Sequence, residues 1–187
     1  MNMTLEERIT RLEDIESIRS LQAKYQRCLD TRDFDGLGEC FTIDATSSYG
    51  NNKMSYQGRD AILEFLTKVM SIHMPSTHLI HGGEVDWIDP NNAKAKWYLE
   101  DNLYHDKALI EIHGAAIYSV EYKKIDGKWL ISSIGYERIY EYANRRRLLN
   151  LFTLHKRTFM KRAKVANPEQ LGKYGQMFYY KHHKKKK

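Results

Sequence analysis

Residues 97–103 read Trp-Tyr-Leu-Glu-Asp-Asn-Leu, and their alternation predicts the middle of a long β-strand. Successive side chains of a strand point to opposite faces, so Trp97, Leu99, Asp101 and Leu103 share one face. That face is apolar except for Asp101. A carboxylate turned to the interior is costly unless it is paired, hydrogen-bonded or facing a polar cavity. Asp101 is therefore either a structural carboxylate, which bridges backbone or is turned outward by a bulge, or a functional one.

Three further long strands are predicted around this one. With it, the four strands cover residues 76–88, 93–105, 108–125 and 128–141. Asp126-Gly127, between the last two, is a strong signal for a hairpin turn. Gly82-Gly83 allows the first long strand to bulge or bend sharply.

Helices are predicted before these strands. Thr4 and Glu7 match a capping box, and the apolar residues that follow recur at helical spacing for about seven turns, so the helix should end near Asp30. Asp33 is placed to cap a short second helix that reaches Phe41. The other early elements are a hairpin over residues 46–49 and 54–56 and a third helix opened by residues 58–60. Helices first and a meander last predict the α+β class, a curved and mostly antiparallel sheet wrapped over N-terminal helices.

Charge is distributed unevenly along the chain. Residues 142–187 carry 14 lysines and arginines and one acid, Glu169, whereas the rest of the chain holds 16 basic and 23 acidic residues. The net charge of +6 therefore hides an acidic body and a basic tail. We expect one domain over residues 1–145 and a basic extension over residues 146–187, partly helical, with a disordered end.

Cysteine usage and hydropathy indicate the class of protein. Cys28 and Cys40 both fall in helical patterns and are expected to be small buried side chains, without a paired redox or metal motif. The sequence has no apolar run long enough for a transmembrane helix and no signal segment at its start. We therefore expect a cytoplasmic protein without a transmembrane segment.

Other ionisable side chains also fall in apolar patterns. Arg138 shares its strand face with apolar and aromatic residues, and His78 begins the first long strand. Tyr25 lies on the apolar stripe of the first helix, and Asp30 lies at its end, where the helix dipole disfavours negative charge. Each has a structural alternative: Tyr25 as a core tyrosine, Asp30 as a solvated loop acid, His78 as a hydrogen-bonded side chain, and Arg138 as the ion-pair partner of Asp101.

Together these five side chains predict proton transfer in an apolar, tyrosine-rich pocket on the concave side of the sheet. Histidine serves as a base, aspartate fixes its tautomer, and tyrosine or arginine holds an oxyanion. His78 and His81 are three residues apart on a strand and point to opposite faces, so the pair predicts no metal site. The expected substrate-binding residues are Tyr49, Trp97, Leu99, Ile112 and Tyr136.

Five stretches carry a family resemblance. They are KYQRCLD at 24–30, THLIHGGEV at 77–85, WYLED at 97–101, IDGKW at 125–129 and GYERIY at 135–140. Their order and spacing resemble the SnoaL-like branch of the NTF2-like cone-fold superfamily, over roughly residues 3–145. Within that branch, the five stretches resemble those of the bile acid 7α-dehydratase family.

The resemblance implies a curved sheet and helices forming a cone with a deep pocket, usually in a homodimer or homotrimer, without metal or organic cofactor. It places Tyr25, Asp30, His78, Asp101 and Arg138 in the pocket. It implies a lyase that removes water from a bulky hydroxylated carbonyl compound, such as a 3-oxo steroid, a bile acid or its coenzyme A thioester. His78 would take the proton and Asp101 orient it. Tyr25 would donate to the enolate, Asp30 assist the departing hydroxyl, and Arg138 hold the carboxylates.

Two other functions fit the same residues. A double-bond isomerase would use nearly the same groups. A non-catalytic module would bind an apolar ligand while the basic tail meets an anionic partner, such as nucleic acid, an acidic lipid surface or an acidic protein. The tail also fits plainer interpretations: a helix docked on the body or on a neighbouring subunit, a solubilising end, or a grip on the phosphates of a coenzyme A thioester.

Overall fold

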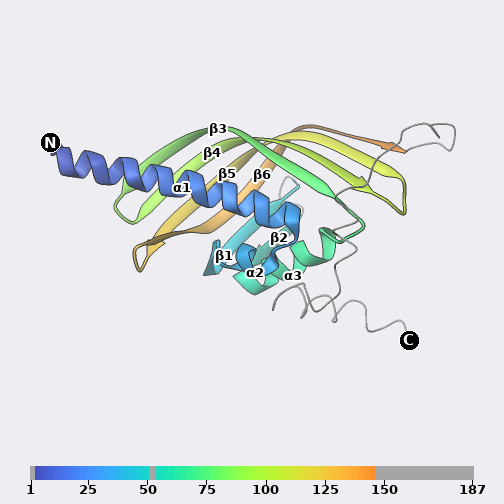
Figure 1. The fold of residues 1–187 in the computed structure, drawn as a ribbon, viewed down its shortest axis with the longest axis horizontal. Helices are drawn as coiled ribbons and strands as arrows, with labels where there is room; N and C mark the ends of the chain where they lie inside the picture. The colour runs from blue at the N-terminus through green and yellow to red at the C-terminus, as the bar shows by residue number, and fades with distance from the viewer. Residues whose placement is uncertain (1–2, 51–53, 146–187) are drawn as a thin grey trace.

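The computed structural model describes residues 3–50 and 54–145, which form three helices and a six-stranded sheet. The long helix α1 (Leu5–Thr31) lies across the concave face of the sheet (Figure 1). Two shorter helices, α2 (Phe34–Gly38) and α3 (Arg59–Val69), lie beside the strands at one edge. The predicted basic extension, residues 146–187, lies outside the described residues. Within the described ranges, no helix is long and apolar enough to cross a membrane.

Local sequence determines where the first two helices begin and end. The Thr4 side chain accepts from the Glu7 N–H at 3.1 Å, and the Glu7 side chain accepts from the Thr4 N–H at 2.7 Å, which confirms the capping box. α1 ends at Thr31 with Arg32 as its C-cap, and Asp33 caps α2 as predicted. The predicted reach of α2 to Phe41 is wrong, because Phe41 instead begins a strand whose backbone pairs with the last strand of the sheet.

The sheet has the strand order β2-β1-β6-β5-β4-β3. The strands are β1 (Phe41–Tyr49), β2 (Met54–Gln57), β3 (Ser76–Asp89), β4 (Asn92–His105), β5 (Ile110–Ile125) and β6 (Lys128–Arg145). All neighbours are antiparallel except β1 and β6, which are parallel. The predicted α+β class with a mostly antiparallel sheet is confirmed. The parallel contact of β1 with β6 was not predicted, because no local turn joins these strands.

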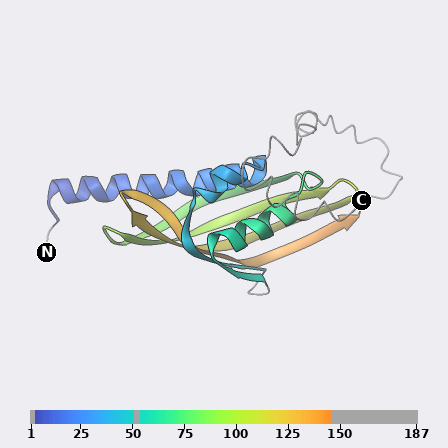
Figure 2. The same cartoon turned by 90° about the horizontal axis from the view of Figure 1, so that it is seen from below.

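Irregular pairing bends the sheet around α1. The register of β3 against β4 shifts between His81 and Gly83, so the predicted bulge is confirmed. A Cβ atom at Gly83 would lie 2.1 Å from the Trp97 ring, so only glycine allows this close approach. β5 and β6 shift register at two further points. Bulges increase local twist and curvature, and the result is the curved sheet seen in Figures 1 and 2.

The core fills the space between α1 and the inner face of the sheet. Every fourth residue of α1 belongs to one row along the helix: Asp14, Ile18, Gln22, Gln26 and Asp30. The first four of these are buried, and so are Cys28 and Cys40, both free thiols as predicted. The first turns of α1 reach beyond the strands (Figure 2), so the apolar residues there are exposed.

Candidate active site

The end of α1 and the start of β3 bring Asp30 against His78. The Nδ1 atom of His78 lies 2.6 Å from one carboxylate oxygen of Asp30, and the His78 backbone N–H donates to the other at 2.8 Å. The second ring nitrogen, Nε2, forms no hydrogen bond with any described residue. When Nδ1–H donates to a carboxylate, Nε2 keeps its lone pair. This histidine is therefore arranged to accept a proton from a ligand.

Several contacts keep Asp30 ionised. Burial pushes the pKa of Asp30 upward, but the hydrogen bonds and charge of His78 and the Ser76 hydroxyl at 2.8 Å outweigh it, so the pKa falls below its ordinary value. A carboxylate that is ionised at neutral pH fixes the imidazole tautomer and stabilises the imidazolium once a proton has been accepted.

Asp101 forms a two-pronged ion pair with Arg138. The Nη1 and Nη2 atoms of Arg138 each lie 2.8 Å from one oxygen of Asp101, whose residue is only 3% exposed. The Nε atom of Arg138 lies 2.9 Å from Glu141. The ion pair between Asp101 and Arg138, predicted as the structural alternative for both residues, is thus confirmed, and both residues face inward.

The predicted role of Asp101 as the carboxylate that orients His78 is wrong. The strand register places Asp101 directly opposite His78, as expected, but the bond to Nδ1 is made by Asp30. Asp101 instead reaches across Gly114 of β5, where a Cβ atom would lie 2.5 Å from the Arg138 guanidinium. Two parallel charged hydrogen bonds to a guanidinium outweigh a single bond to an imidazole.

Tyr25 belongs to a cluster of buried phenols. Its ring lies edge-on to Tyr118 at 6.4 Å, and Tyr118 lies edge-on to Tyr136 at 5.8 Å. The Arg138 guanidinium lies 4.8 Å from the centre of the Tyr136 ring, so the cluster connects Tyr25 to the Asp101 ion pair. Burial, reinforced by Tyr49 and Tyr118, raises the pKa of Tyr25 well above its ordinary value. Its hydroxyl therefore stays protonated at neutral pH.

The five residues predicted to bind substrate lie on the inner side. Tyr49, Trp97 and Leu99 are buried, whereas Ile112 and Tyr136 are half-buried and closer to solvent. The Trp97 indole donates to the Tyr122 hydroxyl at 3.0 Å.

Three further side chains of this region were missed by the sequence reasoning. Ser76 bonds to Asp30, and Arg32 bonds to Ser76 at 3.0 Å. Gln26 is buried, and neither its amide nitrogen nor its oxygen has a partner among the described residues. The four-residue spacing of Gln26 from Asp30 was a signal available in the sequence, as was the position of Ser76 two residues before His78.

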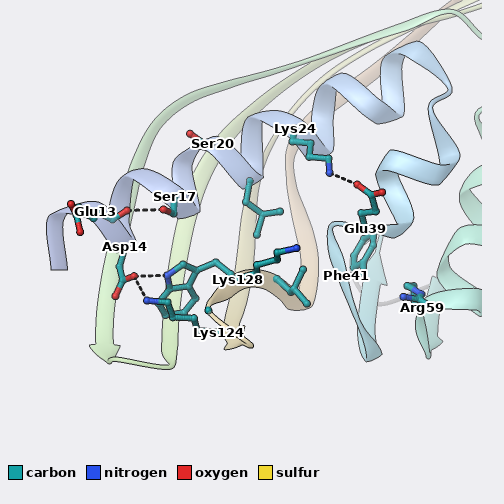
Figure 3. A pocket seen from close by; sticks show the side chains of 14 residues that line it. Glu13, Asp14, Ser17, Ser20, Lys24, Glu39, Phe41, Arg59, Lys124 and Lys128 are labelled. Atoms are coloured by element: carbon teal, nitrogen blue, oxygen red, sulfur yellow. Dashed lines mark hydrogen bonds and ion pairs between the residues drawn. The ribbon is translucent and has the colours of Figure 1, made fainter. Parts of the chain in front are cut away.

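A separate pocket of about 860 Å³ lies beside the middle of α1, between Glu13 and Lys24 (Figure 3). Two ion pairs lie in its lining: Lys124 with Asp14 at 2.7 Å, and Lys24 with Glu39 at 2.8 Å. Sixteen residues of helix separate Asp14 from Asp30, a distance of about 24 Å. The pocket is therefore distinct from the histidine site. In the described part of the chain, no three His, Cys, Asp or Glu residues gather as metal ligands.

Comparisons with known proteins agree with this architecture. A family model described as a SnoaL-like domain matches residues 10–134. A scytalone-dehydratase-like protein from Novosphingobium aromaticivorans DSM 12444 is 19% identical, with a TM-score of 0.67, over 74% of this chain and 92% of that one. A type 3 LinA hexachlorocyclohexane dehydrochlorinase from Novosphingobium barchaimii LL02 is 18% identical, with a TM-score of 0.66, over 73% and 93%. At these identities the likeness shows a shared NTF2-like cone fold.

Proposed function

Because this chain belongs to the SnoaL-like domain family, we propose that it is a cofactor-independent lyase that removes water from a bulky, apolar hydroxylated carbonyl compound. The observation that carries this proposal is the His78–Asp30 pair, with Nε2 left without a described partner on the inner side of the sheet. The names of two structural neighbours add support. A dehydratase and a dehydrochlorinase both remove a hydrogen and a leaving group from a substrate.

Proton transfer at His78 is the central step of the proposed reaction. Nε2 accepts a proton from the carbon beside the carbonyl, or from a carbon conjugated with it, and the electron pair moves to the carbonyl oxygen as an enolate forms. The enolate then expels the hydroxyl, and the imidazolium returns its proton to this leaving group, which departs as water. Asp30 holds the tautomer and stabilises the imidazolium throughout. Asp30 thus takes the orienting role that was expected of Asp101.

Tyr25 is the proposed donor to the enolate oxygen. Its raised pKa keeps the phenol neutral, and a buried O–H directed at developing negative charge is a strong electrostatic contact. Arg138 lies at the other end of the phenol cluster, where its ion pairs with Asp101 and Glu141 hold these carboxylates in place.

The substrate class follows from the inner surface. Ile112 and Tyr136 are half-buried on the inner side, and apolar contact there would suit a rigid ring system such as a 3-oxo steroid, a bile acid or its coenzyme A thioester. Gln26 lies one helical turn before Asp30, and its unpartnered amide suits a polar substituent of such a ring system. An oxygen of the substrate satisfies this amide without disturbing the His78–Asp30 pair.

A direct assay tests the proposed reaction. The full-length protein is incubated with hydroxylated 3-oxo steroids, free or as thioesters where they carry a side-chain acid, and loss of water is followed by mass spectrometry. We expect a conjugated, dehydrated product. Migration of a double bond without loss of water would support the isomerase alternative. Saturable binding of the same steroids without any turnover would contradict the enzyme proposal and support the binding module.

Replacing Gln26 by methionine separates ligand binding from stability. Because a buried amide without partners costs about 1–3 kcal/mol, the Gln26→Met variant is expected to unfold at higher urea concentration than the natural chain. Its KM for the steroid substrate should rise, since the substrate oxygen loses its partner. Gln57→Met, the same replacement at an exposed position of β2, is the matched control and should change neither quantity. Higher stability with an unchanged KM would mean that Gln26 contacts no substrate.

A further inference from the structure

Arg32 occupies a position that is unfavourable for an arginine in two respects. Its backbone has φ of 61°, in the left-handed region that favours glycine at the end of a helix. Its guanidinium is largely buried, and this burial lowers the pKa of Arg32 to about 10 despite the nearby charge of Asp30. Both features cost stability, so the contacts of this side chain must compensate for them.

The guanidinium joins the end of α1 to the chain just before and at the start of β3. Nη1 donates to the backbone oxygen of Asp30 at 2.6 Å and to that of Leu29 at 3.2 Å. Nη2 donates to the backbone oxygen of Met74. The last carbonyls of a helix have no partner within the helix, and Arg32 supplies one. The two segments that carry Asp30 and His78 are thereby fastened together.

Ser76 connects the Arg32 guanidinium to the Asp30 carboxylate. Nη1 of Arg32 also donates to the Ser76 hydroxyl at 3.0 Å. A hydroxyl has one proton to give, and since Ser76 accepts from Arg32, it directs that proton to Asp30 at 2.8 Å. The Asp30 oxygen that receives it is the same one that bonds to Nδ1 of His78. The position of this oxygen therefore depends on Arg32.

We propose that Arg32 is the positioning residue of this site, which sets the Asp30 carboxylate against His78 through Ser76 and through the backbone at the end of α1. It acts through Asp30 and touches no reacting atom. The consequence for turnover rests on the proposed function. The effect on the His78–Asp30 hydrogen bond does not, and it can be measured without any substrate.

Arg32→Gly is the decisive variant, because glycine suits the left-handed backbone and only the side-chain contacts are lost. In proton NMR of the full chain, we expect the natural protein to show a low-field signal from the Nδ1 proton of His78. Arg32→Gly should lose or broaden this signal, and millimolar guanidinium should restore it. Asp126→Gly is the matched control, since it relieves a φ of 49° in the β5–β6 turn and should leave the signal unchanged.

Two further variants keep the test decisive if Arg32→Gly folds poorly. Arg32→Lys retains the charge but not the forked donors, so it should also lose the signal. Ser76→Ala removes the connection through Ser76 alone and should weaken the signal. With a substrate in hand, kcat of Arg32→Gly should fall about 10- to 100-fold, the range known for outer partners of metal-bound histidines, while KM changes little. A folded Arg32→Gly or Arg32→Lys variant with the natural signal would overturn the proposal, whatever the outcome of the dehydration assay.

Discussion

Asp30→Asn is expected to lower kcat/KM for dehydration by about 10²- to 10⁴-fold while the protein stays folded. The asparagine oxygen can still accept the His78 backbone N–H, which holds the end of α1 in place. Its amide nitrogen, however, can only donate to Nδ1. That contact drives the imidazole proton to Nε2, the atom that has to accept the proton from the substrate. Steady-state kinetics on a confirmed steroid substrate measure the loss.

Histidine variants provide the controls for this result. His78→Ala should match the loss seen in Asp30→Asn, because the two side chains act as one unit. His81→Ala should retain natural activity, since His81 is exposed and lies 3.6 Å from Glu100 on the outer face. If Asp30→Asn kept at least half of the natural kcat/KM, Asp30 would not be the partner that orients the base.

Arg138→Met should destabilise the fold by about 3–5 kcal/mol, the largest stability effect expected in this chain. The variant leaves the Asp101 carboxylate buried without its two charged hydrogen bonds. An uncompensated buried charge costs far more than the pair contributes when intact. Urea denaturation of the natural and variant proteins, followed by tryptophan fluorescence, measures the difference in the free energy of unfolding.

The double variant Asp101→Leu with Arg138→Met checks this explanation. Because both charges are removed, most of the lost stability should return, whereas dehydration activity should not. Glu141→Gln serves as a control, since that half-exposed partner of Arg138 should change the free energy of unfolding by less than about 1 kcal/mol. Equal destabilisation in the single and double variants would place the cost in lost packing rather than in the buried charge.

Local sequence patterns predicted much of the fold, because helix caps, turns and bulges form from interactions between residues close in sequence. The capping box at Thr4 forms within one turn of helix, and the Gly82-Gly83 bulge reflects the backbone freedom of glycine. The four long strands follow from alternation and turn signals. The contact between β1 and β6, and the early end of α2 before Phe41, depend on pairing between distant segments. No local pattern reports such pairing.

The sequence by itself determined that Asp101 and Arg138 face the interior, by strand alternation, and that Tyr25 does, by helical spacing. Only the tertiary structure decided how the charged groups pair. Asp101 and Asp30 were both available to His78, and alternation assigns a face but not a partner. Because Gly114 has no side chain, Asp101 and Arg138 can contact each other across β5. The end of α1 packs against the start of β3, which places Asp30 beside His78. Pairing depends on distances between elements, and these arise only when the elements pack.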